Sequence, residues 1–349
     1  MAKIDKLLGY MPTFKASDLH LSPGEPPIYR VHGDIRRAQD ETLTSATIHE
    51  MLIEIMDDRR REIFERTHDL DMIYSIEQLA RFRVNVLLQE RGVSAVFRMI
   101  NNEILTAEQL SLPQAVVRLS GLKRGLVVVT GPTGSGKSTT LAAIINEINS
   151  ERQLHVLTIE DPIEYVHQNK KCLVTQRQVE DHTLGFPQAL RAALREDPDV
   201  ILVGEMRDVE TIRLAITAAE TGHLVLGTLH TASAAKTVDR IIDVFPENDK
   251  EMIRMMLSES LKGVLAQVLL KRIDGKGRVA AFEVLLGSTA LSNLIRESKT
   301  YQIASLIQTS RSQGMQLLDQ SLLDLVKRKI VAPEEAYDYA TDKRAFGNI

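Results

Sequence analysis

The chain of 349 residues carries 43 basic and 47 acidic residues, for a net charge of −4, and 44% of its residues are hydrophobic. This length and hydrophobic content allow two packed domains and exclude a largely disordered chain, while the negative net charge argues against a general attraction to nucleic acid. The only cysteine, Cys172, excludes an internal disulfide and a tetrathiolate zinc site, and we expect it to be a small buried side chain.

Residues 1–100 have the pattern of a small α+β domain. Residues 18–37 indicate two short strands around a Pro/Gly turn, and residues 45–66 have apolar side chains at the spacing of a helix. Three strand-like runs follow, namely 69–76, 80–89 and 93–100. Residues 101–118 are mixed in character and are predicted to be a linker.

Three arginines on the last two of these strands are candidate phosphate ligands. Arg81 and Arg83 alternate with Phe82 and Val84, so both guanidinium groups lie on one face of a strand, and Arg98 falls on the neighbouring strand. A solvated sheet face is one explanation. The other is that these arginines approach phosphates held by the second domain or by a neighbouring subunit, as arginine fingers do.

In the predicted second domain, residues 119–349, continuous apolar strands alternate with helices. The strand-like runs are 124–131, 154–159, 199–204 and 223–229, and the chain from about residue 288 onward is mostly helical. Strands that are apolar on both faces are typical of a parallel sheet covered by helices on both sides. The predicted fold class is therefore α/β with a parallel-rich central sheet.

The segment GPTGSGKST, residues 131–139, has the spacing of a P-loop between an apolar strand and an amphipathic helix. In such a loop the backbone N–H groups bind phosphate oxygens, Lys137 reaches the β- and γ-phosphates, and Ser138 is a ligand of Mg²⁺. The cofactors predicted here are ATP and Mg²⁺. The predicted nucleotide-binding residues are Gly131, Pro132, Thr133, Gly134, Ser135, Gly136, Lys137, Ser138 and Thr139.

Hydrolysis of ATP also needs a carboxylate that orients or polarises water. Glu205 follows the apolar strand 199–204, at the edge of the sheet that faces the ligand in such folds. Gly204 stands where many P-loop enzymes carry a metal-binding aspartate, so the metal would depend on Ser138 and on water. The ordinary alternative for Glu205 is a structural ion pair with Arg207.

Two other strand ends supply polar candidates. Glu160 follows the strand 154–159 and is the second candidate for orienting water. Asp161 and Glu164 come after it, and a solvated acidic turn is the alternative explanation. His230 follows the strand 223–229 and could sense the γ-phosphate, or could be an ordinary packing residue.

The order of these motifs resembles the secretion ATPase superfamily, which drives type II secretion and type IV pili. The P-loop is followed by TIEDPIEYVH, LREDPDVILVGEMRD and GTLHTASAAKT. Over nearly the whole chain the sequence is similar to the pilus-retraction branch of this superfamily, in the segments SDLHLSPGEPP, ARFRVN, AETGHLVLGTLHT, ALSNLIRES and GMQLLDQSL.

The resemblance implies a PAS-like first domain and a RecA-like second domain in a hexameric ring, with ATP bound between the domains. It implies an ATPase motor for pilus retraction and twitching motility, with partners that are the inner-membrane platform protein (PilC-like) and, indirectly, the pilin fibre. It supports catalytic roles for Lys137, Glu205, Glu160, His230, Arg81, Arg83 and Arg98. Since residues 1–18 lack a signal-peptide core and no apolar run approaches the length of a membrane helix, we expect a cytoplasmic protein peripherally bound at the inner membrane.

Two features bear on which member of the superfamily this is. Assembly and type II secretion ATPases typically carry an additional N-terminal region and a four-cysteine zinc element, and their absence here favours retraction. ALSNLIRE, residues 290–297, stands where retraction ATPases usually have AIRNLIRE, with Leu291 and Ser292 as departures, and leaves an accessory retraction ATPase or a specialised paralogue as alternatives. A nucleotide-binding scaffold and a nucleic-acid motor are weaker alternatives, the latter because only 4% of the residues are aromatic.

Overall fold

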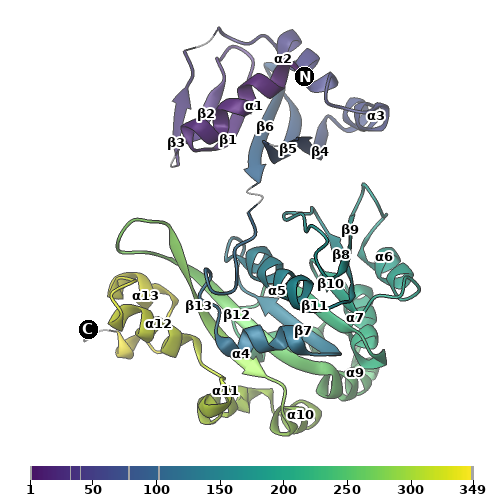
Figure 1. The fold of residues 1–349 in the computed structure, drawn as a ribbon, viewed down its shortest axis with the longest axis vertical. Coiled ribbons are helices and arrows are strands. Elements are labelled where there is room, and N and C mark those ends of the chain that lie inside the picture. Colours follow the sequence, from purple (N-terminus) through teal and green to yellow (C-terminus); the bar gives the residue numbers. More distant parts are fainter. Residues whose placement is uncertain (1, 32, 40, 78, 101–102, 347–349) are drawn as a thin grey trace. The chain divides into compact units, whose positions relative to one another are not determined.

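The protein forms two compact units, Met1–Glu103 and Ile104–Ile349 (Figure 1). The structure is a computed structural model that describes residues 2–31, 33–39, 41–77, 79–100 and 103–346. Residues 104–118, which the sequence analysis assigned to a linker, group with the second unit, and Ala115 and Val116 are buried in one of its cores. The second unit therefore begins before residue 119.

The first unit is built on a six-stranded antiparallel sheet in the order β3-β2-β1-β6-β5-β4. Its strands are β1 (Ala16–Leu21), β2 (Ile28–Val31), β3 (Asp34–Arg37), β4 (Asp69–Ile76), β5 (Ala80–Gln89) and β6 (Gly92–Ile100). Three helices share one hydrophobic core with this sheet: α1 (Lys3–Phe14), α2 (Ser45–Ile53) and α3 (Asp58–Thr67). Since Phe82, Val84 and Phe97 lie in that core, the alternate residues of β5 and β6 face the other side of the sheet.

The expected strands β4, β5 and β6 are present, and the first half of the unit differs from expectation. Residues 18–37 contribute to three strands rather than the expected two, because the chain turns again at Gly33, whose φ is +94°. The single helix expected over 45–66 is two helices, since Asp57 caps the second one by accepting a hydrogen bond from the Arg60 N–H at 2.8 Å. Helix α1 was missed, although its buried residues Ile4, Leu8 and Met11 have helical spacing.

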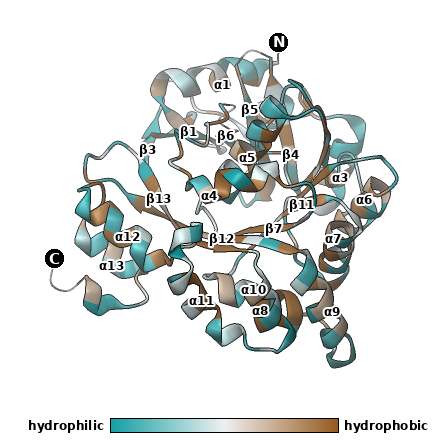
Figure 2. Ribbon diagram, turned by 60° about the horizontal axis from the view of Figure 1, so that its bottom comes forward, coloured by the Kyte–Doolittle hydropathy of each residue, from teal (hydrophilic) through white to brown (hydrophobic). Residues whose placement is uncertain are grey.

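The second unit contains a seven-stranded sheet in the order β13-β12-β7-β11-β10-β8-β9, in which only β13 pairs antiparallel. Its strands are β7 (Gly125–Thr130), β8 (His155–Glu160), β9 (Leu173–Gln178), β10 (Val200–Val203), β11 (Leu224–Leu229), β12 (Leu261–Lys271) and β13 (Arg278–Leu286). Every residue of β7, β10 and β11 is buried, and Figure 2 shows β7 and β11 as largely hydrophobic. The expectation of an α/β fold with a parallel-rich sheet is confirmed.

Helices cover both faces of this sheet, with a separate hydrophobic core on each side. The helices are α4 (Gln114–Val117), α5 (Lys137–Glu151), α6 (Phe186–Ala193), α7 (Val209–Thr221), α8 (Ala234–Asp243), α9 (Glu247–Ser260), α10 (Thr289–Arg296), α11 (Ile303–Thr309), α12 (Leu318–Lys327) and α13 (Pro333–Tyr339). The 3₁₀ helices are Arg118–Gly121, Thr300–Gln302, Arg311–Gln313 and Lys343–Ala345. The chain after residue 288 is thus mostly helical, as expected.

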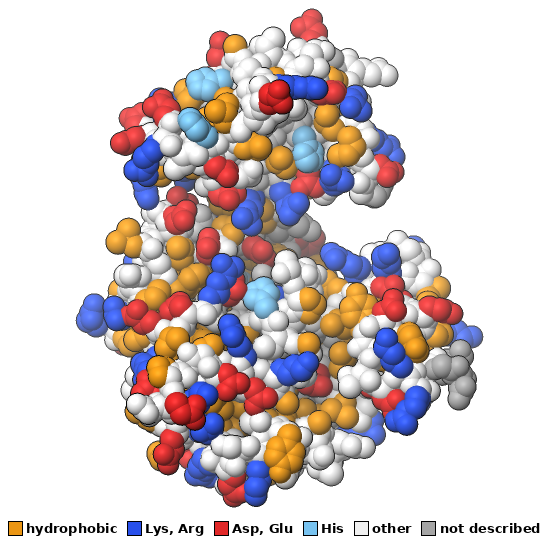
Figure 3. Space-filling model, turned by 180° about the vertical axis from the view of Figure 1, so that it is seen from behind, with side chains coloured by type: hydrophobic (Ala, Val, Ile, Leu, Met, Phe, Trp, Pro, Cys, Tyr) orange, Lys and Arg blue, Asp and Glu red, His pale blue; other side chains and the backbone are white. Residues whose placement is uncertain are grey.

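Basic and acidic side chains are mixed on the face of the molecule shown in Figure 3, where Lys and Arg alternate with Asp and Glu over both units. Cys172 is 3% exposed, which confirms the expectation of a buried side chain. Among the described residues, no helix combines the length and the apolar character needed to cross a bilayer.

Candidate ATP-binding and hydrolysis site

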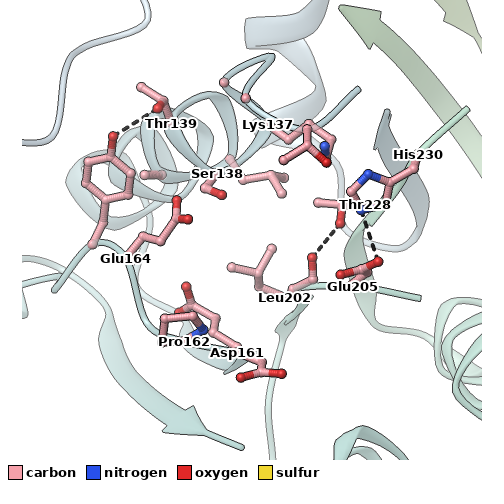
Figure 4. Close-up of a pocket in the computed structure, with 18 of the residues that line it drawn as sticks. Lys137, Ser138, Thr139, Asp161, Pro162, Glu164, Leu202, Glu205, Thr228 and His230 are labelled. Atoms are coloured by element: carbon pink, nitrogen blue, oxygen red, sulfur yellow. Dashed lines mark hydrogen bonds and ion pairs between the residues drawn. The ribbon is translucent and has the colours of Figure 1, made fainter. Parts of the chain in front are cut away.

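A cavity of about 470 Å³ lies where α5 begins and where β8, β10 and β11 end (Figure 4). Neighbouring parallel strands end at one edge of a sheet, so residues far apart in sequence meet there. All the residues that line the cavity belong to the second unit. Among them are Gly134, Lys137, Ser138, Thr139, Glu160, Asp161, Glu164, Tyr165, His167, Glu205, Arg207, Thr228, His230 and Arg278.

The glycine loop is fixed by a residue from a distant strand. Gln267 of β12 donates through Nε2 to the Ser135 carbonyl at 2.6 Å, and its Oε1 accepts from the Thr140 hydroxyl at 2.9 Å. A Cβ atom on Gly131, whose φ is +144°, would lie 2.2 Å from the Gln267 carbonyl oxygen. The first position of the loop therefore has no room for a side chain.

The end of the loop delivers its polar side chains into the cavity. Helix α5 begins at Lys137, and the Lys137 Nζ donates to the carbonyls of Gly131 and Pro132 at 3.0 and 3.1 Å. Burial lowers the pKa of Lys137, and the charges of Glu205 and Glu164 oppose that shift. Helix N-termini favour anions because their backbone N–H groups are not used within the helix. The loop is thus built to receive phosphate.

Glu205 lies just beyond β10 and is held between two basic groups. Its Oε1 atom is 2.6 Å from Arg207 Nε and 3.0 Å from His230 Nε2 (Figure 4). Burial opposes ionisation of Glu205, but the hydrogen bond and charge of Arg207, with a smaller contribution from His230, lower its pKa overall. The carboxylate is therefore ionised at neutral pH and can accept a proton or a hydrogen bond from water.

Glu160, at the end of β8, lines the same cavity in a different setting. Its Oε1 atom accepts hydrogen bonds from the Thr158 hydroxyl at 2.7 Å and from Gln176 Nε2 at 3.1 Å. Both of these partners belong to β8 and β9, so they hold this carboxylate against that edge of the sheet. The structure therefore brings both carboxylates to one cavity, and Glu205 is in contact with His230 and Arg207.

Gly204, next to the two carboxylates, leaves little space for the aspartate that many P-loop enzymes carry there. A Cβ atom on Gly204 would lie 3.0 Å from the Ile159 carbonyl oxygen and 3.2 Å from the Glu160 Cα. Within the described residues, no cluster of three or more His, Cys, Asp or Glu side chains could hold a metal ion. Any metal at this site would therefore be bound mainly by Ser138, by phosphate oxygens and by water.

The three candidate arginines lie in the first unit, on the sheet face opposite its core. Arg83 and Arg98 face each other in the register of β5 and β6, and Arg81 is two residues from Arg83 on the same face. Arg98 Nε is 2.8 Å from an oxygen of the buried Asp18, and Arg83 Nε is 3.8 Å from Asp71. The predicted alternation along β5, in which arginines face one side of the sheet and apolar side chains face the other, is present.

Sequence reasoning gave no role to several residues of the cavity. Tyr165 contacts the Thr139 hydroxyl at 2.9 Å through its OH, and Gln176 Nε2 holds the Tyr165 carbonyl at 2.9 Å. Arg278 enters from β13, a strand that the sequence analysis did not predict. Tyr165 stands inside the acidic motif and could have been found there, whereas Gln267 and Arg278 carry no local signal.

Comparison with known proteins gives a consistent result. The model of the family described as type II/IV secretion system protein matches residues 2–276. The type IV pilus retraction ATPase PilT of Pseudomonas aeruginosa is 55% identical over 337 residues, which cover 97% of this chain and 98% of that protein. The type IV pilus ATPase PilU of the same organism is 40% identical over 338 residues, which cover 97% and 88%.

A solved structure has the same fold. The crystal structure of the pilus retraction motor PilT with bound ADP is similar with a TM-score of 0.93 and 44% sequence identity, over 99% of each chain.

Proposed function

We propose that this chain is the motor that retracts a type IV pilus. The chain belongs to the type II/IV secretion system protein family and is an ATPase of that family. The likeness to PilT over nearly the whole of both chains supports this function. The observation that carries the chemistry is the ionised Glu205, held by His230 and Arg207 in the cavity that the P-loop lysine lines. This is the arrangement expected of a P-loop ATPase that hydrolyses its nucleotide.

In the proposed reaction, the backbone N–H groups of the glycine loop and Lys137 hold the phosphates of ATP. Glu205 orients the attacking water and accepts a hydrogen bond from it. His230, which contacts the same carboxylate, senses the γ-phosphate. When bound, Mg²⁺ neutralises charge on the phosphate oxygens, and Ser138 is the residue that would hold it. Glu160 is the reserve candidate for the water-orienting role.

The proposed motor is a homo-hexameric ring that acts on the inner-membrane platform protein and, through it, on the pilin fibre. Closure of a nucleotide site can move one rigid unit against another, and successive sites around a ring can then move a bound partner. In this ring, we place Arg81, Arg83 and Arg98 at the phosphates of a nucleotide held by another subunit. The three arginines lie on one face of the sheet, so all three guanidinium groups can approach the same phosphate-bearing partner.

The test is ATP turnover together with the mass of the protein in solution, for wild type, Lys137→Ala, Glu205→Gln and Glu160→Gln. We expect a hexamer that hydrolyses ATP, loss of turnover in the first two variants, and retained turnover in Glu160→Gln. If Glu160→Gln is silent and Glu205→Gln is active, the two carboxylates exchange roles. A fully active monomer would refute the ring. A wild-type ring as inactive as Glu205→Gln would leave a scaffold that binds nucleotide.

A PilU-like accessory ATPase is the second candidate, and Ser292 is the observation that favours it. Leu291 is 1% exposed and fills a core position that isoleucine could also fill, whereas the Ser292 hydroxyl donates to the Ser258 carbonyl at 2.6 Å. This hydrogen bond connects α10 to the end of α9. Retraction ATPases usually carry a charged arginine at the position of Ser292. Retraction in cells by the chain alone supports the main motor, and retraction only in the presence of a second ATPase supports the accessory role.

A further inference from the structure

A second cavity, of about 490 Å³, lies in the first unit where α1 meets β2 and β3. Tyr10 and Phe14, one helical turn apart on α1, are 38% and 47% exposed there. Their rings stack with centroids 5.7 Å apart, and Phe14 meets the ring of Tyr29 edge-on at 5.5 Å. An aromatic side chain entering this cavity would therefore find ring faces and edges to pack against.

The cavity borders a free sheet edge. β3 is the outermost strand of its sheet, all four of its residues are exposed, and no described strand pairs with its outer side (Figure 1). The Ala38 N–H bonds inward to the Pro27 carbonyl at 2.9 Å. Because backbone groups alternate in an antiparallel pair, those of Ile35 and Arg37 point away from β2. These groups can pair with one more strand.

β3 carries Asp34, Arg36 and Arg37, and Arg36 is the cation beside the cavity that can meet a ligand. Arg37 is paired with Glu25 at 2.8 Å, whereas none of the described carboxylates forms an ion pair with Arg36. Arg36 lies opposite Tyr29 in the register and lines the cavity. Its side chain therefore lies on the face of β3 that also carries the aromatic rings, where it favours a negatively charged ligand.

From these contacts we infer that β3 and the aromatic cavity bind an extended acidic segment of another protein, which adds to the sheet as a further strand. In this mode the main chain pairs with Ile35 and Arg37, and side chains at alternate positions face the cavity. One aromatic side chain enters the cavity and packs against the rings of Tyr10, Phe14 and Tyr29, and a carboxylate two positions away meets Arg36. A small anionic ligand such as a nucleotide would use the rings and Arg36 but not the outward N–H of Ile35.

The experiment uses the purified full-length chain and a panel of labelled, N-acetylated octapeptides in which glutamate alternates with phenylalanine or valine. Fluorescence anisotropy measures binding, and the control peptides carry lysine in place of glutamate. We expect the acidic peptides to bind, and both Arg36→Glu and Ile35→Pro to weaken binding at least ten-fold. Proline removes only an outward N–H at position 35, so the ladder to β2 remains. Lys276→Glu, the same charge change at an exposed residue of the second unit, should leave binding unchanged.

Three results would each overturn the inference, provided that thermal unfolding shows the variants to be folded. The first is that acidic peptides bind no better than lysine peptides. The second is that Ile35→Pro binds them as wild type does, which removes the added strand. The third is that AMP displaces the peptide and binds equally well to Ile35→Pro, which would make the cavity a site for small anions.

Discussion

We expect the free energy of unfolding to decrease between pH 7 and pH 5 because of His167. Replacing His167 with glutamine should remove that decrease. His167 follows β8 in the nucleotide cavity and is 9% exposed, and its Nδ1 atom has no hydrogen-bond partner among the described residues. Burial, aided by the charge of Lys170, lowers the pKa of His167 to about 4. The ring is therefore neutral in the folded protein down to that pH.

The size of the effect follows from proton binding in the two states. In the unfolded chain the histidine regains its ordinary pKa of 6.5, so it takes up a proton as the pH falls below that value. The folded state cannot take up the proton until about pH 4, so stability is lost as the pH falls through this window. Between pH 7 and pH 5 the loss is about 2 kcal/mol, or roughly 4–8 °C in the unfolding temperature of a unit of this size.

The assay is calorimetric unfolding without nucleotide at pH 7, 6 and 5, for wild type, His167→Gln and His223→Gln. His223 is a half-buried histidine of the same unit whose Nδ1 contacts the Ala218 carbonyl at 3.0 Å, so its replacement controls for the loss of any histidine. We expect the difference between wild type and His167→Gln to change by about 2 kcal/mol between pH 7 and pH 5. Parallel pH curves for these two proteins would refute the reasoning.

Three further outcomes concern the nucleotide site. Gly131→Ala should abolish nucleotide binding, measured by calorimetric titration, because its Cβ would lie 2.2 Å from the Gln267 carbonyl oxygen. Gln267→Leu removes one hydrogen bond to the loop and one to α5, and should weaken ATP binding by about 1–3 kcal/mol in the same titration. Arg207→Gln should move the acid limb of the kcat/KM profile for ATP hydrolysis to higher pH, because Arg207 lowers the pKa of Glu205; an unmoved limb would mean that Glu205 does not set it.

The elements that could be predicted from the sequence are those whose signal is local. Strands β7, β10 and β11 are short runs of continuously apolar residues, and the loop before α5 has a fixed glycine spacing. Strands β9 and β12 were missed for identifiable reasons. β9 is an edge strand with only one buried residue, and β12 follows α9 directly at Leu261, with no glycine or proline to mark the change from helix to strand.

The same distinction applies to the candidate site. Glu205, Glu160 and His230 could be proposed because each follows a strand, and parallel strands end at one edge of the sheet. The contacts that tell the two carboxylates apart come from tertiary structure: Gln176 of β9 holds Glu160, whereas His230, beyond β11, contacts Glu205. Sequence position therefore made Glu205 the first candidate and Glu160 the second, and the contacts of Glu205 with His230 and Arg207 add a reason that only the tertiary structure shows.

Gly204 shows why a departure from a common motif need not mean a lost activity. The N–H of Gly204 bonds the Ile159 carbonyl at 2.8 Å, and any side chain there would press on Glu160. The close approach of β10 and β8 thus disfavours an aspartate at position 204. The next residue, Glu205, lies beyond the end of the strand, in contact with His230 and Arg207. A carboxylate so placed contacts two basic side chains. Burial raises the pKa of Glu205, and the hydrogen bond and charge of Arg207, with a smaller contribution from His230, lower it overall.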